Sequence, residues 1–333
     1  MNEKQSSDKP NYELFRTGLS SYWPENFLSL EKNSFADFKE ITYLGLMPEK
    51  FQIKKPLIAI TNTHFDRKLQ LLWMEKNYPL SLIIHANSGY DLFTEPFLDF
   101  FKMTPLLLGP ELRMHAVAEY YIHCFLHAAG TLPFKKSWDM DRQYPRKLLK
   151  NMSILLIGYG HVGKILEKIL IAFHCKVQIF DPHQFPKNSA QHILDLPIEE
   201  MDGIFCCCDL NKSSKSLIDK KVLQRCKNNI IIINAARGEI CQEIELYQFA
   251  KKNVASQIFL DVFEKEPMDF QDWNQLPNVH LSSHVAGNHE NLILESLEWQ
   301  KNVVKNFLEL TPVEFLKNYQ QINLQDPNFP RIK

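Results

Sequence analysis

The stretch Ile154-Leu-Leu-Ile-Gly-Tyr-Gly-His-Val-Gly163 decides the fold of this chain. Its first four residues are apolar and predict a buried strand, and a helical pattern follows the stretch. Between strand and helix, Gly158, Gly160 and Gly163 have the G-x-G-x-x-G spacing of a dinucleotide-binding turn. The first glycine permits a tight turn, the second lets a pyrophosphate approach the backbone, and the third lets the helix pack closely on the strand. The N–H groups at the start of the helix then face the phosphates.

A second predicted strand, Lys176–Phe180, ends directly before Asp181. Asp181 follows Gly158 by 23 residues, close to the offset of about 20 at which a carboxylate binds the ribose hydroxyls. This acid favours NAD over NADP, because a 2′-phosphate would meet its negative charge, although the nearby His183 and Lys187 weaken that preference. Strand, turn, helix, strand and acid together predict a mononucleotide-binding unit. The alternative is a βαβ unit whose glycines are incidental.

Composition narrows the class of protein. The chain has 333 residues, 45% hydrophobic and 23% charged, with a net charge of −1, which fits a globular protein of two domains without a basic surface for nucleic acid. No run of 18 apolar residues predicts a membrane span, and the polar first ten residues lack the apolar segment of a signal peptide. The seven cysteines include the run Cys206-Cys207-Cys208 and no C-x-x-C pair. We therefore expect a cytoplasmic protein that has no disulfide framework and no metal site.

Strands and helices alternate along most of the chain, which predicts parallel sheets with helices on both faces. Residues 13–55 show no clear period, and residues 130–150 indicate an irregular connector. Ligands of such sheets bind beyond the carboxyl ends of the strands, so we expect the nicotinamide and the substrate in a cleft between two domains. The strands are expected at 56–60, 80–84, 104–108, 154–157, 176–180, 203–207, 230–234, 257–262 and 278–282. The helices are expected at 65–76, 115–129, 162–173, 216–225, 243–252 and 291–310, and residues 93–101 are helical or loop-like.

Three polar residues near predicted strand ends have the chemistry that reduction of a ketone needs. The guanidinium of Arg237, after strand 230–234, can bind a carboxylate and polarise the adjoining carbonyl. The imidazole of His284, after the last strand, can donate a proton near neutral pH. Glu266, 18 positions earlier, can orient that ring. Each residue also has a plainer interpretation: a surface arginine in a turn, a structural histidine and a loop acid.

Taken together, these segments resemble the NAD-dependent D-isomer-specific 2-hydroxyacid dehydrogenase family. The resemblance extends from about residue 80 to residue 290, and its motifs occur in the family's order. They are Ser88-Gly-Tyr-Asp91, Ala116-Val-Ala-Glu119, the glycine motif with Asp181, Asp209–Ile218, Asn234-Ala-Ala-Arg-Gly238, Leu260–Pro267, and Leu276-Pro-Asn-Val with His284-Val-Ala-Gly287.

The resemblance implies the domain organisation. A flavodoxin-like substrate domain, residues 1–115 and 291–333, is expected to be split by an inserted Rossmann NAD-binding domain, residues 116–290. The family also implies a homodimer, formed through the nucleotide domain with the helix at 116–129 in the interface. No partner other than a small 2-keto or 2-hydroxy acid is implied.

The resemblance also assigns roles to individual residues. Arg237 would hold the 2-keto acid, His284 would be the general acid and base, and Glu266 would be the partner of His284. The backbone at Ser88 and Gly89 would bind the substrate carboxylate. The cofactor would contact Gly158, Gly160, His161, Val162, Gly163, Asp181, Cys207, Ala235 and Asp261, with the amides of His161 and Val162 on the pyrophosphate and Asp261 on the nicotinamide carboxamide.

Two residues depart from the family pattern, because Asp209 and Ser283 stand where the family usually has proline. An acid at position 209 would further disfavour a bound phosphate if it faced the ribose. The leading hypothesis is reversible, NAD-dependent reduction of a 2-keto acid to a D-2-hydroxy acid. The alternatives are an NAD-sensing regulatory protein similar to corepressors of this fold, and a dehydrogenase of a phosphorylated hydroxy acid or of phosphite. A formate enzyme fits less well, because that group has an amide in place of Glu266.

Overall fold

The structure is a computed structural model that describes residues 11–20, 23–47, 55–63, 65–130, 132, 134–142, 144, 146–184 and 190–318. The expectations that concern residues 1–10 and Lys187 lie outside these ranges. The chain divides into two compact units: residues 1–113 with 289–333 form unit 1, and residues 114–288 form unit 2. Within the described ranges, no helix is long and apolar enough to cross a membrane.

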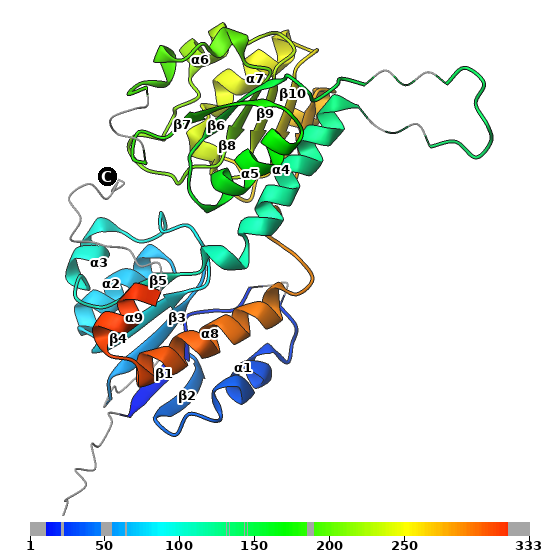
Figure 1. Cartoon of the computed structure of the whole chain (residues 1–333). Helices are drawn as coiled ribbons and strands as arrows, with labels where there is room; N and C mark the ends of the chain where they lie inside the picture. The colour runs from blue at the N-terminus through cyan, green and yellow to red at the C-terminus, as the bar shows by residue number, and fades with distance from the viewer. Residues whose placement is uncertain are drawn as a thin grey trace, which may run out of the picture. The chain divides into compact units, whose positions relative to one another are not determined.

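Unit 1 is built on a parallel sheet of five strands in the order β2-β1-β3-β4-β5. Helices α2 and α3 cover one face around Trp73 and Phe97, and α1, α8 and α9 cover the other around Phe35, Val303 and Phe315 (Figure 1). The strands are β1 Tyr12–Arg16, β2 Ile41–Leu46, β3 Leu57–Thr61, β4 Leu80–His85 and β5 Leu106–Leu108, and the helices are α1 Phe27–Phe35, α2 Arg67–Lys76, α3 Glu95–Phe100, α8 Leu292–Glu309 and α9 Pro312–Asn318.

Unit 2 is built on a parallel sheet of six strands in the order β11-β10-β9-β8-β6-β7. Helices α4 and α5 pack on one face through Tyr121, Phe125, Leu166 and Leu170, and α6 and α7 lie on the other side (Figure 1). The strands are β6 Ser153–Ile157, β7 Lys176–Phe180, β8 Gly203–Cys206, β9 Ile231–Asn234, β10 Gln257–Leu260 and β11 Val279–Leu281, and the helices are α4 Met114–Ala129, α5 His161–Ala172, α6 Lys220–Arg225 and α7 Glu243–Lys252. The prediction of two doubly wound parallel-sheet domains is confirmed.

The structure adds elements where the sequence shows no period, and it shortens several of the expected helices, α6 the most. Residues 13–55 contain α1, β2 and all of β1 except its first residue, Tyr12. Strand β2 is an edge strand that is only partly buried, so it has no hydrophobic run to detect. Helix α6 begins at Lys220 rather than at Ser216, because Ser216 has a positive φ of 55° and the Asp219 side chain caps the helix by accepting the N–H of Val222.

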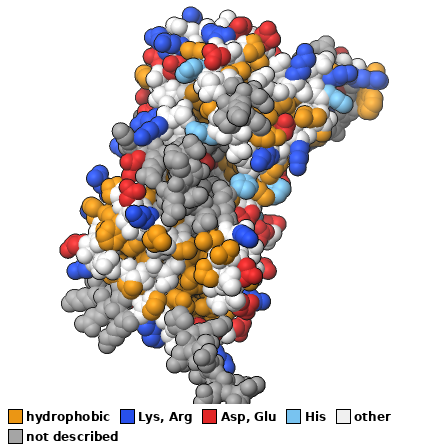
Figure 2. Space-filling model, turned by 60° about the vertical axis from the view of Figure 1, so that its left-hand side comes forward, with side chains coloured by type: hydrophobic (Ala, Val, Ile, Leu, Met, Phe, Trp, Pro, Cys, Tyr) orange, Lys and Arg blue, Asp and Glu red, His pale blue; other side chains and the backbone are white. Residues whose placement is uncertain are grey.

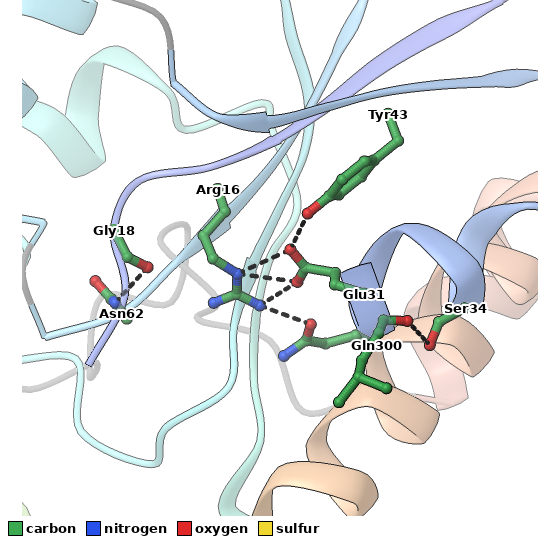
Figure 3. Close-up of polar contacts among 8 residues, drawn as sticks. Arg16, Gly18, Glu31, Ser34, Tyr43, Asn62 and Gln300 are labelled. Carbon is green, nitrogen blue, oxygen red and sulfur yellow. Dashed lines mark hydrogen bonds and ion pairs between the residues drawn. The ribbon is translucent and has the colours of Figure 1, made fainter. Parts of the chain in front are cut away.

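A buried cluster of charged and polar side chains links β1 and α1 of unit 1 to α8 (Figure 3). Arg16, at the end of β1, is 1% exposed, and Nε donates to Oε1 of Glu31 in α1 at 2.9 Å. A second guanidinium nitrogen donates to Glu31 and also to Oε1 of Gln300 in α8, at 2.9 Å in the second bond. The Tyr43 hydroxyl donates to Oε2 of Glu31 at 2.6 Å, since burial and the Glu31 carboxylate raise the pKa of Tyr43.

The Arg16–Glu31 ion pair is buried, so each charge needs the other. The guanidinium also lies over the rings of Trp23 and Phe27, at 4.7 and 5.0 Å from their centroids. Burying two charges carries a large desolvation cost, which only close geometry and additional hydrogen bonds offset. Loss of either charge therefore leaves the other buried and uncompensated.

We predict that Glu31→Gln destabilises unit 1 by about 3–5 kcal/mol, because it keeps the side-chain shape but leaves the Arg16 charge buried and unpaired. The matched control is Asp37→Asn. It removes the exposed ion pair between Asp37 and Lys301, 3.1 Å apart, and should cost about 0–1 kcal/mol. Urea-induced unfolding followed by tryptophan fluorescence measures both, and equal losses in the two variants would contradict the prediction.

Candidate active site

The glycine turn after β6 is held by close backbone contacts that exclude larger side chains. Gly158 has a positive φ of 99°, and a Cβ there would lie 2.7 Å from Cα of Cys208. A Cβ on Gly163 would lie 2.3 Å from the carbonyl oxygen of Gly158. These two glycines are therefore needed so that α5 and the loop after β8 can pack against the turn. The Cys207 thiol completes the contact by donating to the Gly158 carbonyl at 3.2 Å.

Gly160 differs from these two glycines. Its φ is −76°, and a Cβ there would meet nothing within 4 Å among the described residues. No contact with the described residues thus requires glycine at this position. The helix α5 begins at the next residue, His161, followed by Val162, so the N–H groups of its first turn point toward this open space. Open space beside a helix N-terminus fits the phosphates of a dinucleotide.

Asp181 lies at the end of β7, beside the glycine turn. Its Oδ2 accepts the N–H of Tyr159 at 2.8 Å, and its Oδ1 accepts the N–H groups of His183 at 3.0 Å and Gln184 at 2.9 Å. The carboxylate is therefore fixed next to the glycine turn, as a ribose-binding acid requires. The imidazole Nε2 of His183 lies 3.0 Å from the hydroxyl of Ser213, in the loop after β8.

The structure brings Arg237, Glu266 and His284 together in unit 2. Nδ1 of His284 lies 2.7 Å from Oε2 of Glu266, and the other carboxylate oxygen accepts the N–H of Phe263 at 3.0 Å. The His284 side chain is 50% exposed and that of Glu266 is 36% exposed, so both remain accessible to a ligand. Each residue follows a strand of the same sheet at its carboxyl end: Arg237 after β9, Glu266 after β10 and His284 after β11.

The charge state of Glu266 follows from these neighbours. Partial burial opposes ionisation, but the hydrogen bond and charge of His284, the Phe263 N–H and the Arg237 charge outweigh it and lower the pKa of Glu266 below its usual range. A carboxyl group with a depressed folded-state pKa stabilises the fold above its unfolded pKa and loses that contribution as the pH falls through the folded value. Glu266 therefore stays ionised, and able to accept the His284 hydrogen bond, to a lower pH than an isolated glutamate would.

The loop that carries His284 is held by Asp261. His284 has a positive φ of 53°, an uncommon backbone conformation for a residue with a side chain. Its N–H donates to the Asp261 carbonyl at 2.7 Å, and the N–H groups of Val285 and Ala286 donate to the two Asp261 carboxylate oxygens at 2.8 Å each. Asp261 is fully buried. Its predicted contact with a nicotinamide carboxamide stays a prediction.

The loop that carries Arg237 is fixed at both ends. The Asn234 side chain donates to the Arg237 carbonyl at 2.8 Å and accepts the N–H of Ala236 at 3.1 Å. A Cβ on Gly238 would lie 1.9 Å from the carbonyl carbon of Phe263, so only glycine lets this loop contact the loop that leads to Glu266. The Asn-Ala-Ala-Arg-Gly motif thus contains two residues, Asn234 and Gly238, that place Arg237 beside Glu266.

The other residues singled out in the sequence differ in exposure and in hydrogen bonding. The N–H of Ala235 donates to the Tyr121 hydroxyl at 3.0 Å. Asp209 is exposed, and its carbonyl accepts the Ser214 hydroxyl at 2.6 Å. Ser283 is exposed. Ser88, which is exposed, and Gly89, which is buried, lie in the loop after β4 of unit 1, and their part in substrate binding stays a prediction.

Comparison with known proteins identifies this arrangement. Residues 127–286 match the sequence profile described as the D-isomer specific 2-hydroxyacid dehydrogenase, NAD binding domain. Over this range the chain is similar to the D-isomer-specific 2-hydroxyacid dehydrogenase family. The matched range contains the glycine turn, Asp181, Arg237, Glu266 and His284.

Two relatives show how far the family likeness extends. The chain is 31% identical over 173 residues to hydroxypyruvate reductase of Thermotoga maritima, covering 50% of this chain and 56% of the relative. It is 30% identical over 217 residues to erythronate-4-phosphate dehydrogenase of Wigglesworthia glossinidia brevipalpis, covering 64% and 53%. The chain spans between 36% and 58% of the length of the curated relatives it matches first.

Solved structures share the whole fold at lower identity. D-lactate dehydrogenase of Aquifex aeolicus, solved with NAD and lactic acid, has a TM-score of 0.72 and 20% identity, covering 93% of this chain and 99% of its own. An NADPH-dependent glyoxylate/hydroxypyruvate reductase of Sinorhizobium meliloti, solved with NADP and malonate, has a TM-score of 0.68 and 15% identity, covering 90% and 94%. Structures of this fold therefore include complexes with either cofactor.

We predict that Gly160→Ala leaves the free energy of unfolding within about 0.5 kcal/mol of wild type but raises the dissociation constant of NADH at least about 10-fold. The reason is that the new methyl group occupies only the space that faces the phosphates. Gly163→Ala is the contrasting variant and should lose about 1–3 kcal/mol from overpacking against Gly158. Thermal unfolding and a fluorescence titration with NADH measure both, and unchanged NADH affinity in Gly160→Ala would contradict the assignment.

Proposed function

We propose that this chain is an NAD-dependent oxidoreductase that acts on a CH–OH group and reduces a 2-keto acid reversibly to a D-2-hydroxy acid. The observation that carries the proposal is the 2.7 Å contact between His284 and Glu266, with the Arg237 charge acting on the same carboxylate. In this proposal His284 is the proton donor, Glu266 orients it and Arg237 binds a carboxylate. All three follow strands of the sheet that also carries the glycine turn. This combination is what reduction of a 2-keto acid requires beyond a hydride source.

Each side chain has a definite part in the mechanism that we propose. The nicotinamide cofactor, when bound, supplies the hydride to the keto carbon. Because Nδ1 of His284 donates to Glu266, Nε2 is the nitrogen that delivers the proton to the carbonyl oxygen. Glu266 holds the ring and stabilises the imidazolium, and the Arg237 guanidinium binds the substrate carboxylate and the developing charge. In the reverse direction His284 takes the proton from the hydroxyl.

We propose NAD rather than NADP as the cofactor. Asp181 supports this choice, because its carboxylate is fixed beside the glycine turn, where a 2′-phosphate would be repelled. The opposing argument from Lys187 concerns a residue outside the described ranges. The ratio of catalytic efficiencies with NADH and NADPH tests the proposal, and a preference for NADPH would overturn it.

Two classes of acid are candidate substrates. Hydroxypyruvate and erythronate 4-phosphate are named for relatives of this chain, so unphosphorylated and phosphorylated acids are both candidates. Among the early basic residues, Arg16 does not favour a phosphorylated substrate, because it is buried and its charge is paired with Glu31. We therefore propose an unphosphorylated 2-keto acid.

The decisive experiment is an NADH-oxidation panel with glyoxylate, hydroxypyruvate, pyruvate, bulkier 2-keto acids and phosphorylated analogues. Turnover with an unphosphorylated acid supports the proposal. Faster turnover with a phosphorylated analogue would show that the substrate is a phosphorylated acid instead. Absence of turnover with every acid, together with binding of NADH, would favour the regulatory alternative.

We predict that His284→Ala lowers kcat by about 10²- to 10⁴-fold, the range that a positioned acid contributes, and leaves the dissociation constant of NADH within about 2-fold. The matched control is His192→Ala. His192 is an exposed histidine of the same unit, in the segment between β7 and β8, and its loss should change neither value. Stopped-flow turnover and fluorescence titration measure both parameters. Full activity in His284→Ala would show that another group donates the proton.

We propose further that the enzyme is a cytoplasmic homodimer. The cytoplasm is supported by all seven cysteines being free thiols. The dimer is supported by exposed apolar side chains on the segment after α4: Phe134, Trp138 and Met140 are 89%, 75% and 76% exposed. At the upper right of Figure 2, where this segment projects, such side chains lie beside Lys and Arg. Light scattering at micromolar concentration should give twice the chain mass, and a monomer mass would overturn the dimer.

A further inference from the structure

Tyr120 of α4 is linked to the loop of His284 by hydrogen bonds that bridge 162 positions of sequence. The Tyr120 hydroxyl lies 2.7 Å from the hydroxyl oxygen of Ser282, and the Ser282 hydroxyl donates to Oδ1 of Asp261 at 2.6 Å. A serine hydroxyl has one hydrogen. Since Ser282 gives it to Asp261, Tyr120 is the donor in the first bond.

Asp261 connects Ser282 to the backbone around His284. Its buried carboxylate needs donors on both oxygens, and it receives them from Ser282, Val285 and Ala286. The Val285 and Ala286 amides directly follow His284, whose own N–H is bound by the Asp261 carbonyl. An uncommon positive φ, such as the 53° of His284, persists only where the surroundings fix it.

We propose that Tyr120 is a positioning residue for His284, acting through Ser282 and Asp261. The inference rests on the proposed function, because it assigns Tyr120 to the proton donor of that reaction. Tyr120 itself is half-buried on α4 and belongs to none of the motifs that mark the family in this chain. Burial raises the pKa of Tyr120, so its hydroxyl keeps the proton that it donates.

The first test is kinetic. Tyr120→Phe and Ser282→Ala should each lower kcat about 10-fold, less than the about 10²-fold that a 1 Å misplacement can cost, and leave the dissociation constant of NADH within 2-fold. Ser282→Thr keeps the hydroxyl and should recover most of the rate. Tyr247→Phe is the matched control, because it removes a hydroxyl from another half-buried tyrosine of unit 2, whose ring packs edge-on against Trp273 at 5.2 Å; it should leave kcat unchanged.

Epistasis separates positioning from general destabilisation. In a His284→Ala background, Tyr120→Phe should produce no further fall in kcat, because the group that it positions is already absent. An equal fall in both backgrounds would overturn the proposal, since Tyr120 would then act on the fold or on another group.

The second test does not depend on turnover. Hydrogen exchange of the Val285 and Ala286 amides, measured by mass spectrometry or NMR in the full chain, should be at least about 10-fold faster in Tyr120→Phe and Ser282→Ala than in wild type or Tyr247→Phe. Unchanged exchange overturns the proposal whatever the kinetics show. If the wild type reduces no 2-keto acid, the proposed function fails, while the exchange rates still decide whether Tyr120 orders this loop.

Discussion

The candidate site depends on one buried carboxylate, that of Asp261. A charge in this position has no water to solvate it, so the surrounding chain must supply donors. Those donors are the serine and the two amides that frame His284. The hydrogen bonds that this buried carboxylate requires therefore fix the backbone of the loop that carries His284, the proposed proton donor.

Hydrogen bonds and close backbone contacts also fix other strand ends of unit 2. Tyr121, next to Tyr120 on α4, donates to the Cys206 carbonyl and accepts the Ala235 N–H, so this helix also fixes the ends of β8 and β9. Gly163 and Gly238 let backbone approach backbone where any side chain would collide. Together these contacts give the site a fixed geometry before a ligand arrives, which is the condition for efficient proton transfer and binding.

The sequence predicted the parts of this arrangement that have local signals. Hydrophobic runs located the central strands, glycine spacing located the turn, and residue chemistry after strand ends located Arg237, Glu266 and His284. Half-exposed edge strands such as β2 have no such signal. The Tyr120–Ser282 bond had none either, because its partners are 162 residues apart and neither residue type is unusual. A lone sequence shows what a side chain can do, but not which distant hydroxyl it meets.

The cluster of Arg16, Glu31 and Gln300 has a consequence for how the chain is made. Unit 2 is continuous, residues 114–288, whereas unit 1 needs α8, which follows unit 2 in the sequence. On the ribosome the nucleotide-binding unit is therefore complete before Gln300 exists. Until α8 emerges, β1 and α1 hold a charged pair and an apolar sheet face without their cover. The segment that is synthesised first, residues 1–113, is thus the last to acquire its finished core.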